Sequence, residues 1–239
     1  MKLVQLARAS LLVLTMTATP AFAADMAVRA KPESAPVAAF DWTGFYAGGT
    51  AGYGWDRSQI CDADDGCSDR YNIGGFAGGG TLGYNWQTGG WVFGLEGDIS
   101  YANIEGSGTG FGCGNGCQTE VQWFATLRGR AGPTFDRLLL FVTGGLAVAH
   151  LEAGFVANQL PGSATRTGWT LGAGLEWAFA PNWSTKLEYL HIGGLGAFNA
   201  DPISDCLPAC FVPRSSFNVV RAGLNYRFAT GNAPLATRY

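Results

Sequence analysis

The sequence predicts an all-β protein, an eight-stranded antiparallel up-and-down transmembrane β-barrel with short periplasmic turns and four long outer loops. First, segments in which apolar and polar residues alternate follow one another from residue 44 to residue 228. Second, short and long connections alternate between these segments. Third, glycine (36 residues) and aromatic residues (13%) are abundant. That composition suits strands, because glycine costs about 1 kcal/mol in a helix interior.

The first residues have the pattern of a secretory signal peptide. Lys2 and Arg8 provide the positive charge, a short apolar run follows, and Ala21-Phe22-Ala23 forms an A-x-A cleavage site. Cleavage is expected after Ala23, with Ala24 as the next choice, so residues 1–23 would be removed. The apolar run is too short to favour the alternative, a membrane anchor helix.

Residues 24–41 contain Pro32, Pro36 and many alanines without any periodic pattern, and they are expected to form a flexible periplasmic linker. Loss of the signal peptide leaves 13 basic and 18 acidic residues. This acidic balance argues against a nucleic-acid partner, because phosphate binding requires a basic surface.

Residues 42–228 are predicted to form the barrel, and residues 229–239 a C-terminal tail. The short connections are expected at residues 88–89, 133–137 and 181–182, and the long ones at residues 56–73, 105–119, 153–166 and 194–215. All four long connections then lie at one end of the meander, as in bacterial outer-membrane barrels. The eight expected strands are residues 44–55, 74–87, 90–104, 120–132, 138–152, 167–179, 183–193 and 216–228.

The faces of these strands indicate which side meets lipid. In residues 90–104, Trp91, Phe93 and Leu95 share one face, and Glu96 and Asp98 lie on the other. Large aromatic side chains would overfill the interior of an eight-stranded barrel, which is only wide enough for ordinary side chains. We therefore expect the apolar face outside, against hydrocarbon, and the polar face inside. The alternative is a soluble barrel whose charged face is solvated.

The inward charges are expected to pair, because buried charges are tolerated only with partners. In the stretch from Glu120 to Gly132, polar residues occupy every second position except at Phe124, which places Glu120, Arg128 and Arg130 in the lumen. Five acids would face five bases. No wide pore is expected, because side chains fill the lumen of an eight-stranded barrel. The predicted lumen charge network is Glu96, Asp98, Glu120, Arg128, Arg130, Glu176, Lys186, Glu188, Arg221 and Arg227.

Six cysteines remain in the exported chain, and all lie in the expected long connections. An even number in an exported protein favours disulfides. Zinc is a poorer interpretation, because the spacings do not fit and His150 and His191 lie far away in sequence. Pairing within each loop is expected, with pairing between loops as the alternative. The local pairs are Cys61 with Cys67, Cys113 with Cys117, and Cys206 with Cys210.

Several motifs resemble a known family. DWTGFYAGGTAGYGW at residues 41–55 is similar to the first-strand signature of small porin-like outer-membrane β-barrel proteins of Gram-negative bacteria, which include the 25 and 31 kDa surface antigens and, more distantly, the opacity family. Residues 82–101, 140–150 and 218–228 resemble later strands of that family. The resemblance implies an outer-membrane location, with outer-membrane lipid and lipopolysaccharide as partners.

The last strand, ending in NYRF, resembles the signal that the barrel assembly machinery recognises. In that signal an aromatic residue closes the strand and apolar residues precede it at alternate positions. The resemblance assigns this role to Ala222, Leu224, Tyr226 and Phe228. The chain continues to another aromatic residue, Tyr239, so either Phe228 or Tyr239 is the residue that the machinery reads.

No motif in the sequence indicates catalysis, a cofactor or a metal, and the protein is not expected to be an enzyme. The acidic loop of residues 61–67 is interpreted as solvated, with weak calcium binding as the alternative. The expected function is structural: envelope integrity and surface presentation, with a lumen plugged by paired charges. The alternatives are a narrow passive channel, or a module that binds a host surface or haem through its outer loops.

Overall fold

The computed structural model describes residues 40–62, 66–109, 116–155, 162–199, 210–212 and 215–228. The predicted signal peptide, nearly all of the linker and the C-terminal tail lie outside the described residues. Among the residues described, no helix is long and apolar enough to cross a membrane.

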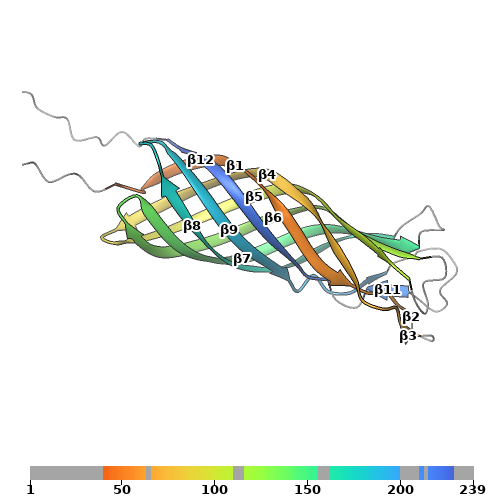
Figure 1. The fold of residues 1–239 in the computed structure, drawn as a ribbon. Helices are drawn as coiled ribbons and strands as arrows, with labels where there is room; N and C mark the ends of the chain where they lie inside the picture. The colour runs from red at the N-terminus through yellow and green to blue at the C-terminus, as the bar shows by residue number, and fades with distance from the viewer. Residues whose placement is uncertain are drawn as a thin grey trace, which may run out of the picture. The chain divides into compact units, whose positions relative to one another are not determined.

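Eight long antiparallel strands form a closed barrel (Figure 1), which confirms the predicted fold class. Each strand pairs with its neighbours in the chain, and β1 pairs with β12 to close the ring. The barrel strands are β1 (Gly44–Ser58), β4 (Tyr71–Thr88), β5 (Trp91–Gly108), β6 (Cys117–Phe135), β7 (Leu138–Phe155), β8 (Gly162–Ala178), β9 (Trp183–Gly193) and β12 (Phe217–Arg227).

The connections at the periplasmic end are short, as expected. Two of them are two-residue turns, after β4 and after β6. Gly89 and Asp136 adopt positive φ angles of 59° and 55° there, the left-handed conformation that tight hairpin turns require. Asp136 takes this conformation although it is not glycine, and its carbonyl and carboxylate both accept hydrogen bonds from the N-terminal segment.

At the other end, six of the barrel strands extend three to five residues beyond their predicted limits, so the outer connections are shorter than expected. Parts of the first and last outer connections pair with each other in a small sheet of order β10-β11-β2-β3. Its strands are β2 (Cys61–Asp62), β3 (Gly66–Cys67), β10 (Phe198–Asn199) and β11 (Cys210–Val212). Strands of 15 to 19 residues in β1 and β4–β8 exceed the roughly 10 residues needed to span a bilayer.

The outside of the barrel carries an apolar band between two groups of aromatic side chains. Trp91, Phe93, Leu95 and Leu127 all point outward and are exposed, as expected from the alternation. Such a band is typical of a lipid-facing surface. Towards the outer end of the strands the exposed aromatic side chains are Tyr53, Trp55, Phe76, Tyr101, Trp169 and Tyr189; towards the periplasmic end they include Phe45, Trp86, Trp91, Trp177, Phe179, Trp183 and Phe228.

Strand β6 changes the phase of its alternation. Its register with both neighbouring strands shifts between Val121 and Trp123. An irregularity of this kind moves the following side chains to the opposite face. Val121 and Phe124 therefore point into the barrel and are buried, whereas Glu120 lies on the outer face. The placement of Glu120 in the lumen was wrong.

Candidate functional site

The interior of the barrel is the candidate site, and its middle is occupied by a cluster of charges that we call the ionic layer. The cluster comes from five strands, β5, β6, β8, β9 and β12. Four carboxylates and four cations belong to it, all with almost no solvent exposure. They are Glu96, Asp98, Arg128, Arg130, Glu176, Lys186, Glu188 and Arg221.

Glu96 and Arg128 face each other on β5 and β6, and Arg128 Nη2 lies 2.5 Å from Glu96 Oε1. Lys186 Nζ reaches both carboxylate oxygens of Glu96 at 2.8 Å from the other side of the lumen. Arg128 also donates through Nη1 to Glu188 at 2.6 Å. The contacts thus link the neighbouring strands β5 and β6 to β9 across the lumen.

Arg221 completes one side of the ionic layer. It lies 2.8 Å from Asp98 and 2.9 Å from Glu188, and Glu188 is its register partner on β9. On the periplasmic side, Arg130 Nη1 donates to Glu176 Oε2 at 2.8 Å. Charge-assisted hydrogen bonds at these distances are among the strongest that side chains make.

Neutral side chains complete the ionic layer, and sequence reasoning missed them because they carry no charge. Tyr46 Oη donates to Glu96 Oε2 at 2.7 Å, and its ring lies under the Arg130 guanidinium at 4.8 Å. Asn85 accepts from Arg130, and Thr126 donates to Asp98. Ser184 and Asn225 both donate to Glu176. Their inward position in the strand alternation was the signal that could have identified them.

Two glycines leave the space that the ionic layer needs. A side chain at Gly83 would overlap the ring of Tyr46. A side chain at Gly94 would meet Asn85 and the stem of Arg130. The glycine-rich inner face therefore accommodates long polar side chains from other strands.

Arg227 does not join the ionic layer, contrary to the prediction. Its side chain has the inward phase of β12. However, Arg227 lies two residues beyond Asn225 and is therefore at the periplasmic rim of the barrel. There its guanidinium lies 4.3 Å from the ring centroid of Phe40 and donates to the carbonyl of Pro181. Glu120 is also outside the ionic layer. The observed cluster therefore has one acid and one base fewer than the predicted network, and it contains four acids and four bases.

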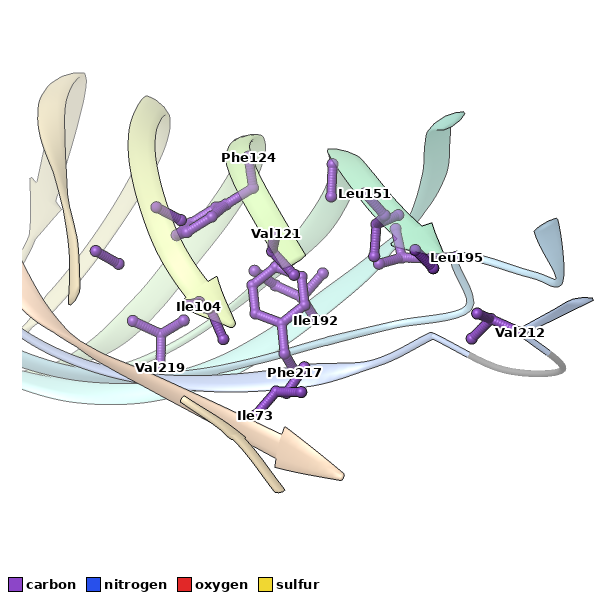
Figure 2. Packing of buried hydrophobic residues seen from close by; sticks show 14 of the residues in the cluster. Ile73, Ile104, Val121, Phe124, Leu151, Ile192, Leu195, Val212, Phe217 and Val219 are labelled. Atoms are coloured by element: carbon purple, nitrogen blue, oxygen red, sulfur yellow. The ribbon is translucent and has the colours of Figure 1, made fainter. Parts of the chain in front are cut away.

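Above the ionic layer, towards the outer end, the lumen is filled by a second group, the apolar layer. Figure 2 shows its side chains converging inside the barrel. The rings of Phe124 and Phe217 meet edge to face, with centroids 5.4 Å apart. The layer includes Ile73, Ile104, Val121, Phe124, Leu151, Ile192, Leu195, Val212, Phe217 and Val219.

Below the ionic layer, the residues preceding β1 close the periplasmic end and form what we call the periplasmic cap, Phe40 to Trp42. The Trp42 amide donates to Gln87, and its indole Nε1 donates to the carbonyl of Asp136 at 3.1 Å. The indole is buried against Val92, Leu139, Phe141 and Ala178. A cavity of about 10 Å³ remains between the cap and the ionic layer, space for about one water molecule.

The cysteines lie at the outer end. Cys61 and Cys67 form a disulfide across β2 and β3, as expected. Cys117 is buried at the start of β6 and is also disulfide-bonded. Its predicted partner Cys113 lies outside the described residues, as does Cys206, and Cys210 is described only as a backbone position in β11.

The residues of the predicted assembly signal lie on the outside of β12 and, for Phe228, directly after its end. Ala222, Leu224, Tyr226 and Phe228 are all exposed, and the Phe228 amide donates to the carbonyl of Phe45 on β1. Their role in assembly stays a prediction. Tyr239, the alternative terminal aromatic residue, lies outside the described residues.

Both histidines lie on the barrel wall rather than in the loops. The ring of His150 stacks on Trp123, and its Nδ1 is 3.0 Å from Thr165. His191 Nδ1 is 2.9 Å from Asn218 Oδ1. Within the described part of the chain, no three histidine, cysteine or acidic side chains are grouped so that they could hold a metal ion.

Comparisons with known proteins agree with this architecture. The sequence model of a family described as "Outer membrane protein beta-barrel domain" matches residues 9–228. The 31 kDa outer-membrane immunogenic protein of Brucella melitensis is 36% identical over 233 residues, which cover 89% of this chain and 95% of that protein. The 25 kDa outer-membrane immunogenic protein of Brucella canis is 32% identical over 173 residues, 71% of this chain and 75% of the relative.

Among solved structures, Neisserial surface protein A is similar with a TM-score of 0.45 and 14% identity. The match covers 78% of this chain and 98% of that protein.

Proposed function

Since the chain belongs to the outer membrane protein beta-barrel domain family, we propose that it is a structural protein of the outer membrane, with a closed lumen, that supports envelope integrity and presents its outer loops at the cell surface. The outer-membrane location follows from the family and from its named relatives. The proposal assigns no catalytic role to the chain.

The observation that carries the proposal is the continuous filling of the lumen. The periplasmic cap, the ionic layer and the apolar layer follow one another along the barrel. An ion crossing the barrel would have to displace buried ion pairs, and breaking one such pair costs about 3–5 kcal/mol. It would then have to pass side chains such as Phe124 and Phe217, which have no exposed surface.

A specific observation also supports surface presentation. The first and last outer connections share the small β10-β11-β2-β3 sheet, and the Cys61–Cys67 disulfide closes one end of it. A paired and cross-linked loop offers a defined surface to the outside. Relatives at 31% to 36% identity carry the description "immunogenic" in their names, which is consistent with outer loops that antibodies reach.

Planar bilayer recording tests the closed lumen. The protein, refolded with its full mature length, is expected to give no large, stable channel openings. The control is a second outer-membrane barrel with a known open pore, refolded in the same detergent. Reproducible openings of the wild-type protein would favour the alternative, a narrow passive channel.

Envelope integrity is tested in cells. Deletion of the gene in the native bacterium is expected to increase sensitivity to detergent and to dyes that an intact outer membrane excludes. The wild-type gene restores resistance. A deletion strain as resistant as its parent would contradict this part of the proposal while leaving the closed lumen unaffected.

A further inference from the structure

A recess of about 660 Å³ lies on the outside of the barrel wall, towards its outer end, where β12, β1, β4 and β5 are neighbours. It belongs neither to the lumen nor to the loop sheet. Its lining combines two aromatic side chains with groups that donate and accept hydrogen bonds: Tyr53, Trp55, Arg57, Asn72, Glu105 and Asn218.

The register of the strands explains why the wall is hollowed there. Trp55 on β1 and Glu105 on β5 both pair with Gly74 on the strand between them. Because Gly74 has no side chain, the hydroxyl of Tyr53 can lie over it, between the indole of Trp55 on one side and the carboxylate of Glu105 on the other. Two register positions further out, Arg57 faces Asn72 on the same side of these strands.

Several of the polar groups are held in place before any ligand binds. Arg57 Nε donates to Asn72 Oδ1 at 3.3 Å. Asn218 Oδ1 accepts from Tyr189 Oη at 2.7 Å, and its Nδ2 donates to the Trp55 carbonyl at 3.4 Å. A site with fixed polar groups loses less free energy on ordering when a ligand arrives.

The position of the recess identifies what it meets. The register pair at the lower edge of the recess is Tyr53 with Phe76, two aromatic side chains more than half exposed. Aromatic residues of this kind lie at the boundary between hydrocarbon and head groups. The next pairs outward are Trp55 with Gly74 and Arg57 with Asn72, so the recess opens sideways at the level of the outer-leaflet head groups.

The chemistry of the recess favours a sugar over a bare phosphate. One cation, Arg57, stands beside one carboxylate, Glu105, so the recess carries no excess of positive charge. A pyranose ring has hydroxyl groups that both donate and accept, so it can use Arg57, Asn72 and Glu105 together. Its apolar C–H face can pack on the indole of Trp55, since an aromatic ring combines an apolar face with low conformational entropy.

We propose that this recess binds a sugar unit of the glycolipid of the outer leaflet, lipopolysaccharide, with the indole of Trp55 as its platform and Arg57, Asn72 and Glu105 as its hydrogen-bonding partners. The acyl chains of the same molecule lie along the apolar band below Tyr53. The inference goes beyond the closed lumen and stands if the lumen proves to conduct.

Binding is measured on the full-length mature protein refolded in detergent, with three probes. These are intact rough-type lipopolysaccharide, the same molecule without its acyl chains, and phosphatidylglycerol, which has a phosphate and acyl chains but no sugar. Intact lipopolysaccharide is expected to bind most tightly and the deacylated form more weakly. Phosphatidylglycerol is expected not to compete.

Four variants assign the binding to the recess. Trp55→Leu and Glu105→Gln are expected to weaken binding of both sugar-containing probes by about tenfold, which corresponds to about 1.4 kcal/mol. The matched controls are Trp91→Leu, an exposed tryptophan near the periplasmic end, and Glu152→Gln, an acid on the outer wall of β7. Both controls are expected to bind as the wild type does.

A mobility shift on heating verifies that each variant is folded before binding is measured. Unchanged binding in Trp55→Leu would overturn the proposal, as would equal losses in the two controls. Competition by phosphatidylglycerol would assign the recess to phosphate or acyl chains instead. Equal affinity for intact and deacylated probes would point to a soluble sugar rather than a membrane glycolipid.

Discussion

Among single residues, Glu96 contacts many of the side chains in the ionic layer. Its carboxylate accepts hydrogen bonds from Arg128, from Lys186 and from Tyr46, and it also lies 3.6 Å from Arg130. Three cations from β6 and β9 therefore depend on one acid on β5. Removal of one partner from such a cluster leaves buried charge without compensation, which costs more than the pair contributed.

Glu96→Gln is expected to reduce the free energy of unfolding by about 3–5 kcal/mol, because Lys186 and Arg128 keep their charges in a dry environment. Urea titration followed by the loss of the folded band on gels measures the change. The double variant Glu96→Gln with Lys186→Met restores neutrality and is expected to recover part of the loss.

Asp69→Asn is the matched control for the loss of one acid, because Asp69 is exposed near the start of β4. Its effect is expected to stay within about 0.5 kcal/mol. Equal stability of Glu96→Gln and the wild type would show that the ionic layer is not a tightly coupled cluster.

For single residues, the sequence predicted which face of a strand a side chain occupies better than its position along the barrel axis. Arg128 and Arg221 were identified because alternation alone places them inside. Arg227 has the same inward phase, but only the structure shows that it lies at the rim, beyond the reach of the buried acids. Tyr46 and Asn225 share the inward face and were missed because charge was the criterion.

Among the elements, β6 is the strand whose prediction needed correction. Strict alternation treats Phe124 as an exception on a polar face. In the structure the side chain of Phe124 points into the barrel. Glu120 lies on the outer face instead of the predicted inner face, because the register of the strand shifts between Val121 and Trp123. An apolar residue at a position expected to be polar was therefore the only sequence signal of the irregularity.

Phe124→Ala is expected to reduce the free energy of unfolding by about 3–5 kcal/mol, because it leaves a cavity beside Phe217 in the apolar layer. Phe76→Ala is the matched control, since Phe76 is 52% exposed on the outside of β4. It is expected to cost clearly less, and the same urea titration compares the two. A larger loss in the control would place Phe124 outside the packed interior.

The small sheet of the outer connections makes a different prediction. Replacing Cys61 and Cys67 together by serine removes the cross-link between β2 and β3 but touches no barrel strand. The variant is expected to assemble, to lose no more than about 2 kcal/mol of stability and to be cut faster by protease in the first outer connection. Failure of the variant to form the folded barrel would show that the barrel depends on this disulfide for its stability, contrary to the prediction.

For the whole molecule, closure of the ring is the property that a membrane imposes. Every backbone N–H and C=O within hydrocarbon needs a partner, so a sheet with a free edge is excluded there. β12 supplies partners to both β1 and β9 along nearly its whole length. The sequence predicted all eight strands and their order, because period-two alternation runs through most of each strand, with β6 interrupted only between Val121 and Trp123. The extensions of the strands at the outer end were not predicted, because the alternation of apolar and polar residues is weak there and the composition resembles that of a polar loop.

Truncation tests this closure. A chain ending after Phe228 keeps β12 complete and is expected to insert into the outer membrane and to show a mobility difference between boiled and unboiled samples. A chain ending after Ser216 lacks β12 and is expected to show neither. Failure of the longer truncation would indicate that the assembly machinery reads Tyr239 instead of Phe228.

The seam between β1 and β12 joins the earliest and the latest strands that the ribosome makes. No shorter length of the growing polypeptide contains both sides of that seam, so the cylinder cannot be completed during translation. A finished but unfolded chain must therefore travel from the ribosome across the inner membrane to its destination, and throughout that journey its exposed tryptophans and leucines need protection by chaperones.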